Sequence, residues 1–402
     1  MRRTMTQSPS LLAALVLIVL LAACQPALPR PVVQPTASPT PQPPIAIGAI
    51  LNLDSDAGPD GLQRLEAAKL AVDLVNRRGG VVLASGERRL LSLVVYDDGG
   101  RPDTAEASFR RLANDGVPVV LGPSAAESVA VVRRAAEAAS VPLIALSDQD
   151  GGEAGSWRWT FSLAAHSEDS VAAALDFFAA SGVERIGWLA PRTMDASTLR
   201  RMLFRLAAAS RIQIVGEEQY APGSEDFAPG LARVQAGNPS VILAWPRDSH
   251  EAAAIVRDAG KARDLAPIFL GPAAATPSTL TLVGDGAAVV RTLTLRLGVA
   301  DDLWDHDALT PVIRDFRREL QAQTGRVPTA EAAATWDAVR LIVATLEQVA
   351  PTRTAIRDAL EGTGDYLGAS GTISFTTRRH DGLDRRAFVV ARSDARRWRL
   401  PP

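Results

Sequence analysis

IAIGAIL, residues 45–51, and EAAKLAVDLVNRRGG, residues 66–80, are the stretches that decide the fold class. The first is a short, unbroken apolar run, which is typical of a strand buried on both faces of a sheet. The second lies within a periodic segment, residues 62–78, whose spacing predicts a helix that ends at the Gly-Gly pair 79–80. A buried strand followed by a helix is the unit from which parallel sheets are built.

The same alternation of strand and helix continues along the chain. The pattern predicts strands at residues 90–96, 117–121, 141–146, 185–190, 212–217, 241–245 and 267–270, and helices at 125–139, 168–180, 197–209, 227–235 and 249–259. Pro102 suits the first turn of one further helix. Two series of strands with helix-length spacers predict an α/β protein of two doubly wound, Rossmann-like lobes with parallel-sheet cores.

The composition excludes several classes of protein. The 402 residues are 47% hydrophobic and 22% charged, with a formal net charge of −2. This apolar content is too high, and this net charge too low, for a disordered chain. We expect no nucleic-acid partner, because the chain has no excess of positive charge. Cys24 is the sole cysteine, so the chain can form no internal disulfide.

The first 24 residues have the features of an export signal. Arg2 and Arg3 precede an apolar run, residues 11–21, which is too short to span a bilayer as a helix but fits the core of a secretory signal peptide. The following LAAC, residues 21–24, resembles the lipobox of bacterial lipoproteins, in which the cysteine is lipidated and becomes the mature N-terminus. The resemblance implies a membrane anchor at Cys24 and an outward-facing protein secreted across the cytoplasmic membrane. The alternative is an ordinary signal peptide with an incidental cysteine.

Residues 25–44 are rich in proline, threonine, glutamine and serine. Such a stretch favours extended polyproline II, at about 3.1 Å per residue, over helix or sheet. We therefore expect it to be a tether between the anchor and the folded part.

Phrases spread over the rest of the chain resemble the type I periplasmic binding proteins of the branched-chain amino acid (Leu/Ile/Val) receptor family of ABC transporters. They are residues 66–80, VYDD (95–98), LGPS (121–124), VPLI (141–144), PGSEDF (222–227), TWDAV (335–339), RDALEG (357–362) and GTISF (371–375). No phrase decides alone, but their order and spacing together match the family.

The resemblance implies a three-crossover hinge, with crossings near Leu163, Leu295 and Leu367. Lobe one is then residues 45–163 plus 296–366, and lobe two is residues 164–295 plus 367–402. A ligand binds between such lobes, at the carboxyl ends of the strands, and closes the hinge. The implied partners are a small-molecule ligand and the permease subunits of an ABC importer.

Carried over by position, the family's amino-acid contacts fall on residues of a different kind. Its hydroxyl, aromatic and acidic contacts fall on Asp60, Ala126, Gln149, Met194, Asp248 and Ala273, and a backbone contact falls on Ser147. Nearly every polar or aromatic contact to an amino acid is therefore absent. Acidic residues near the expected cleft mouth outnumber the two arginines there, Arg192 and Arg247. We expect a ligand that is neutral or cationic and is not an ordinary aliphatic amino acid.

Three of the candidate ligand contacts also have a structural interpretation. Ser124 and Glu127 have the spacing of a capping box at the start of the helix 125–139. Asp248 precedes a helix and can be its N-cap. Trp245, at the end of a strand, can either stack on a ligand or pack in the core.

Nothing in the sequence indicates catalysis, a cofactor or a metal. The four histidines are scattered without ligand spacing, and the Gly-x-Ser-x-Gly, Walker A and Gly-x-Gly-x-x-Gly motifs are absent. Three hypotheses remain: a lipid-anchored receptor for an ABC importer, an envelope sensor or partner protein with a degenerate cleft, and an undetected hydrolase.

Overall fold

The computed structural model describes residues 42–54, 58–147, 157–284, 290–394 and 397–401. The predictions for the signal peptide, for Cys24 and for nearly all of the tether lie outside these residues. No helix in the described ranges is both long and apolar enough to cross a membrane.

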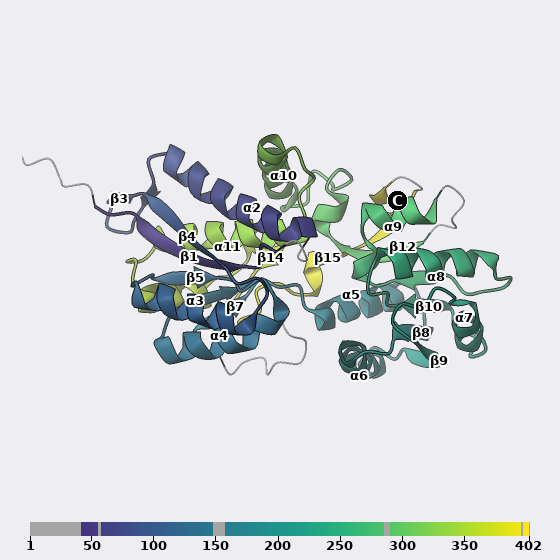
Figure 1. Ribbon diagram of the computed structural model, residues 1–402. Coiled ribbons are helices and arrows are strands. Elements are labelled where there is room, and N and C mark those ends of the chain that lie inside the picture. Colours follow the sequence, from purple (N-terminus) through teal and green to yellow (C-terminus); the bar gives the residue numbers. More distant parts are fainter. Residues whose placement is uncertain (1–41, 55–57, 148–156, 285–289, 395–396, 402) are drawn as a thin grey trace, which may run out of the picture. The chain divides into compact units, whose positions relative to one another are not determined.

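Five parallel strands form the first sheet, in the order β4-β1-β5-β6-β7 (Figure 1). Their bounds are β1 Ile45–Leu51, β4 Leu91–Asp97, β5 Val119–Leu121, β6 Leu143–Ala145 and β7 Thr160–Ser162. A two-stranded ribbon, β2 Val81–Val82 with β3 Arg88–Arg89, precedes β4. The predicted buried strand at residues 45–51 is confirmed and lies inside the sheet.

Helices cover both faces of this sheet. Their bounds are α2 Gly58–Arg77, α3 Pro102–Asn114, α4 Ala126–Ala139, α10 Thr310–Thr324, α11 Ala330–Leu346 and α12 Arg353–Glu361. Figure 1 shows α2, α10 and α11 on one side of the strands and α3 and α4 on the other. Alternate residues of β1 serve the two faces: Ile47 packs in the core that α2 and α11 share, and Ile50 packs with Phe109 of α3.

The second sheet has seven strands in the order β16-β15-β12-β11-β10-β8-β9. Their bounds are β8 Arg185–Pro191, β9 Gln213–Tyr220, β10 Val241–Ala244, β11 Ile268–Leu270, β12 Arg291–Leu295, β15 Phe388–Ser393 and β16 Trp398–Arg399. The five strands from β12 to β9 are parallel, whereas β15 and β16 extend the sheet in antiparallel fashion. The predicted parallel-sheet core is thus present, with an antiparallel edge added by the C-terminal segment.

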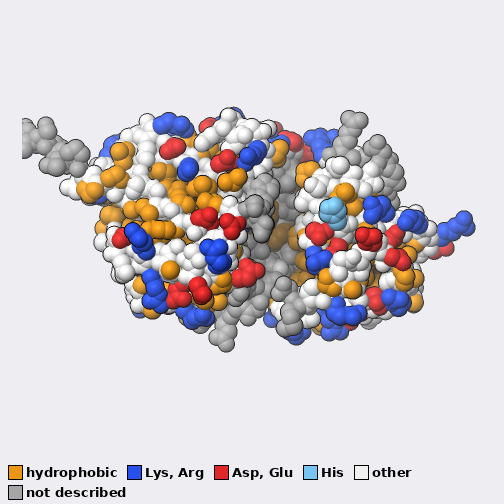
Figure 2. All heavy atoms as spheres, in the orientation of Figure 1, with side chains coloured by type: hydrophobic (Ala, Val, Ile, Leu, Met, Phe, Trp, Pro, Cys, Tyr) orange, Lys and Arg blue, Asp and Glu red, His pale blue; other side chains and the backbone are white. Residues whose placement is uncertain are grey.

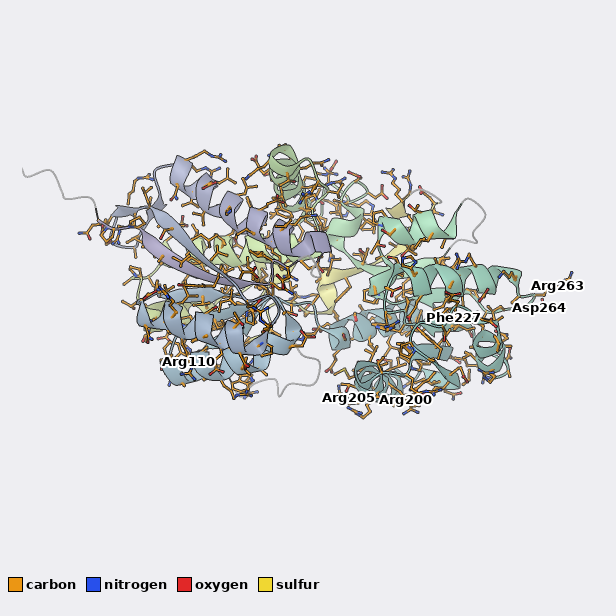
Figure 3. The ribbon with its side chains drawn as sticks, viewed as in Figure 1. Arg110, Arg200, Arg205, Phe227, Arg263 and Asp264 are labelled. Carbon is orange, nitrogen blue, oxygen red and sulfur yellow. The ribbon has the colours of Figure 1, made fainter. Side chains whose placement is uncertain are left out.

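Five helices and three short 3-10 turns accompany the second sheet. They are α5 Ser167–Ala180, α6 Met194–Ala209, α7 Ala228–Gln235, α8 Ser249–Lys261, α9 Pro277–Val283, η2 Pro272–Ala274, η3 Arg296–Val299 and η4 Arg385–Ala387. Figure 3 shows Arg200 and Arg205 on α6, with Arg263 and Asp264 beyond the end of α8. Charges of both signs alternate on the face seen in Figure 2, which agrees with the low net charge.

The chain passes between the two sheets three times, as a type I periplasmic binding fold requires. It leaves the first sheet after β7, returns after β12, and joins the second sheet again at β15. Before that last crossing, the hairpin β13 Tyr366–Leu367 with β14 Thr372–Ile373 and the loop after it stay beside the first sheet. There Ser162 accepts a hydrogen bond from the N–H of Gly382 at 2.8 Å. The residue ranges of the two lobes stay a prediction.

At two positions in the first lobe, a glycine allows two backbone segments to approach each other closely. Gly80 has φ +92°, and a Cβ there would lie 2.2 Å from the carbonyl oxygen of Arg89. The predicted Gly-Gly end of the first helix is therefore confirmed, since α2 ends at Arg77 just before it. Gly122, at the end of β5, has φ +98°, and its Cβ would lie 2.1 Å from the carbonyl oxygen of Ile50.

Candidate functional site

The loop after β5 is where the sequence predicted a capping box, and that prediction is wrong. Ala125 is the N-cap of α4, and no side chain caps the helix. The Ser124 hydroxyl instead accepts a hydrogen bond from the N–H of Asn52 at 2.8 Å. Ser124 therefore joins the carboxyl ends of β5 and β1, and Glu127 is left exposed in the first turn of α4.

Other candidates in the first lobe lie near the same edge of the sheet. Ala126 is the half-buried first residue of α4, and its methyl group offers no hydrogen bond. Ser147 follows β6 and is half-buried. Asp60 belongs to α2, but its side chain is outside the described part of the structure, and Gln149 lies entirely outside it.

In the second lobe, Trp245 follows β10 and packs against its neighbours. Its ring lies 6.0 Å from the ring of Trp188, centroid to centroid, and directly over the backbone of Gly271. These contacts favour the packing interpretation of Trp245. Ala273 lies in η2 after β11 and is half-buried, and Met194 is the first residue of α6, with its side chain outside the described part.

Asp248 is the N-cap of α8. Its Oδ1 accepts hydrogen bonds from the backbone N–H groups of His250 and Glu251, both at 2.9 Å. The capping interpretation of this residue is confirmed, and it accounts for both the extended backbone of Asp248 and the start of the helix at Ser249.

A buried carboxylate close by, Glu251, was missed by the sequence analysis. Glu251 is 4% exposed and accepts hydrogen bonds from the Tyr220 hydroxyl at 2.8 Å and from the Arg247 N–H and Nε at 2.9 and 2.7 Å. Burial alone would raise the pKa of Glu251, but these bonds outweigh it and hold that pKa below its usual value. Burial, and then the bond to Glu251, raise the pKa of Tyr220.

The hydrogen bonds of Glu251 change the balance of acidic and basic side chains that the sequence predicted at the mouth of the cleft. Arg247 was one of two arginines counted there, and its guanidinium is paired with Glu251. Arg247 precedes the N-cap Asp248, so this ion pair is not a pair within the helix, and the spacing rule for helical ion pairs could not have predicted it.

A pocket of about 240 Å³ lies where the carboxyl end of β6 meets the crossing segments of the chain. We call it the crossover pocket; its lining is Arg64, Leu146, Ser147, Leu163, Ala164, Ala165, Ser167, Leu295, Ala330, Glu331, Ala334, Ser370 and Leu383. Of the sequence-predicted site residues, Ser147 alone is in this lining. Two predicted crossing positions, Leu163 and Leu295, also line it, whereas Leu367 does not and is 41% exposed.

The polar groups of the crossover pocket come from distant parts of the chain. Arg64 of α2 is buried, and one guanidinium N–H donates to the Leu146 carbonyl at 3.2 Å. Glu331 is in the first turn of α11, which packs beside α2, and the Gln63 amide oxygen accepts the Thr329 N–H at 3.1 Å. Sequence reasoning missed both charges because no local pattern links residues so far apart.

Asp337 of α11 fixes the pocket residue Ser370. The fully buried carboxylate accepts hydrogen bonds from the Ala369 N–H at 2.8 Å, from the Ser370 N–H at 2.7 Å and from the Ser370 hydroxyl. Burial raises the pKa of Asp337 to about 6, against these bonds, which lower it. The turn between β13 and β14 is thereby held to α11 next to the pocket.

A second pocket, of about 300 Å³, is lined by residues of α7 and of the end of α8. It lies near the amino ends of β10 and β11, and its lining includes Arg263, which is labelled in Figure 3. None of the sequence-predicted site residues lines it. In the described part of the chain, no three histidine, cysteine or acidic side chains are grouped to hold a metal ion.

The family model described as periplasmic binding protein matches residues 44–396. The chain belongs to the periplasmic binding protein family. Among curated proteins, none is similar enough in sequence to be matched.

Solved structures with the same fold come from several bacteria. A candidate branched-chain amino acid ABC transporter protein from Rhodospirillum rubrum has a TM-score of 0.74 at 20% identity, over 89% of this chain and 100% of its own. An ABC transporter substrate-binding protein from Desulfitobacterium hafniense, complexed with Leu, gives 0.69 at 20% identity, over 89% and 99%. A branched-chain amino acid transporter substrate-binding protein from Streptococcus pneumoniae, complexed with isoleucine, gives 0.66 at 19% identity, over 88% and 97%.

These likenesses show that the expected fold class and family are right. The chain has the two-lobe α/β fold of type I periplasmic binding proteins. Proteins of this family work outside the cytoplasm and bind small molecules.

Proposed function

We propose that this protein is a lipid-anchored solute receptor that captures a small polar ligand between its two lobes and delivers it to an ABC importer. Cys24 is the proposed anchor, residues 25–44 the tether, and residues 45–402 the folded receptor. The receptor binds its ligand and does not transform it.

The crossover pocket is the observation that carries this proposal. It lies at the carboxyl end of β6, where open parallel sheets place their ligands, and it is lined by segments that cross between the lobes. Its volume of about 240 Å³ is just below the range of about 300–1,000 Å³ that is typical of drug-sized ligands, so it suits a small solute. Three serines and two charged side chains provide several polar contacts.

The ligand we propose is not an ordinary aliphatic amino acid. The half-buried side chains of Ala126 and Ala273 are methyl groups, at positions where the family resemblance implies a hydroxyl and an acid. Trp245 is packed on Trp188 and Gly271, and Asp248 caps a helix. The related structures that contain leucine or isoleucine therefore indicate the fold of this protein and do not indicate its ligand.

The same substitutions favour one alternative. A degenerate cleft would suit an envelope sensor or partner module, which keeps the fold but recognises another protein. The two hypotheses differ in whether a small solute stabilises the folded chain.

Thermal unfolding against a broad solute panel tests the proposal. The panel should contain aliphatic and basic amino acids, amides, urea-like compounds, polyamines, sugars and aromatic acids. A ligand at about 100 times its Kd stabilises the folded state by roughly 2.7 kcal/mol, which gives a clear rise in Tm. A rise with one polar solute, and none with leucine, supports the receptor; no rise with any solute supports the partner module.

A further inference from the structure

The first turn of α11 brings one acidic side chain to the crossover pocket. Ala330, Glu331 and Ala334 all line the pocket, and residues three and four apart share one face of a helix. This face of α11 is therefore the wall of the pocket, and Glu331 provides its only carboxylate among the lining residues.

No cation of the described chain pairs with Glu331. Within the described residues, no arginine, lysine or histidine lies within 4.0 Å of its carboxylate, although Glu331 is half-buried. In the second lobe, by contrast, the buried Glu251 is paired with Arg247. A half-buried carboxylate without a cation gains most from a positively charged partner that arrives with the ligand.

Arg64 of α2 lines the same pocket. Its guanidinium donates a hydrogen bond to the Leu146 carbonyl at 3.2 Å.

We propose that Glu331 is a specificity-determining residue that binds a cationic group, so that the ligand is a small ammonium- or guanidinium-bearing solute. This inference rests on the proposed receptor function and names the chemistry of its site. The family resemblance implies a carboxylate in the second lobe at the position of Ala273, and in this proposal Glu331 of the first lobe provides the carboxylate in its place.

A charge series of short solutes tests the assignment by titration calorimetry on the full chain. The probes are putrescine, agmatine, arginine and γ-aminobutyrate, which carry an ammonium or guanidinium group, and butyramide and butyrate, which carry none. We expect binding from the first set alone, and Glu331→Gln should weaken it at least tenfold, equivalent to about 1.4 kcal/mol.

Asp103→Asn is the matched control. Asp103 is an exposed acid in the first turn of α3, and it loses the same charge at the same kind of position without lining the pocket. It should leave the Kd unchanged, and the Tm of both variants without ligand should confirm that they fold.

Each other outcome overturns the inference in a distinguishable way. Binding of butyramide or butyrate, or cation binding that Glu331→Gln does not weaken, contradicts the role of Glu331 while leaving a working receptor. Binding by no probe in either set contradicts the role of Glu331 and counts against the receptor function as well.

Discussion

The Ser370 backbone N–H donates to the Asp337 carboxylate at 2.7 Å, and this bond joins the turn between β13 and β14 to the helix that lines the crossover pocket. The pair also predicts a pH dependence. Burial raises the pKa of Asp337 to about 6 in the folded chain, whereas the pKa is near 3.8 in the unfolded chain. Between these two pH values the folded chain holds a proton on Asp337 that the unfolded chain has released. Folding stability from this group is therefore complete below about pH 4 and is lost as the pH rises through 6.

Asp337→Ala tests this relationship by urea unfolding between pH 4 and 7. Loss of the acceptor leaves buried N–H groups of Ala369 and Ser370 unpaired, so the variant should be less stable by about 2 kcal/mol or more at pH 4. The difference in unfolding free energy between wild type and variant should narrow by up to about 3 kcal/mol from pH 4 to pH 7, because only the wild type has Asp337 and loses stability in this range. Ser370→Ala keeps Asp337 but removes a hydrogen bond that lowers its pKa, so the stability of this variant should fall at least as steeply between pH 4 and 7 as that of the wild type. A difference that stays constant with pH would contradict the argument.

Asp248→Ala separates a helix cap from a ligand contact. The variant should lose about 1 kcal/mol of unfolding free energy, since two N–H groups of α8 lose their acceptor. Asp248→Asn keeps an acceptor and should lose less. Ligand affinity, measured by calorimetry, should be unchanged in both; a drop in affinity with full stability would place Asp248 in the binding site instead.

The Glu251 network predicts an acid sensitivity of opposite sign to that of Asp337. Since its hydrogen bonds lower the pKa of Glu251 in spite of burial, stability from this group is present above the unfolded value of about 4.5 and is lost as the pH falls through the folded value. Glu251→Gln should therefore cost about 1–2 kcal/mol at pH 7, with a smaller cost near pH 3. Urea unfolding at both pH values measures this, and an equal cost at both would refute the assignment.

Cys24 carries the prediction about the membrane. Cys24→Ser should move the protein from the membrane fraction to the soluble or unprocessed fraction and should abolish labelling with a radioactive fatty acid. Neither change should occur with a serine substitution in the tether, such as Thr36→Ser. Unchanged labelling of the Cys24 variant would show that the lipobox resemblance is misleading.

Local signals predicted the fold well. The apolar run at residues 45–51 and the Gly-Gly pair after α2 gave the right strand and helix end, because burial and positive φ act on neighbouring residues. The start of α2 at Gly58 was placed four residues too late, at residue 62, since Gly58-Pro59 offers no apolar periodicity. The antiparallel strand β15 was not foreseen, because its partner β12 lies about a hundred residues earlier in the sequence, and the short strand β16 that pairs with β15 was not foreseen either.

The site was harder to predict for the same reason. For Asp248 the sequence left both a ligand contact and a helix cap open, and the structure shows the cap, which involves residues two and three positions away. Ser124 was assigned wrongly, because it bonds to Asn52, which is 72 residues away, in place of the helix that it precedes. Glu331 and Arg64 line the same pocket only because α11 packs beside α2 in the folded chain.

The most direct test of the central claim is native mass spectrometry of the full chain purified from its own membrane. The receptor account predicts one small polar solute bound per chain, released on unfolding, that carries a cationic group and is not leucine, isoleucine or valine. Stoichiometric leucine, isoleucine or valine, or a chain that carries no solute after purification and takes up none from the panel, would contradict it.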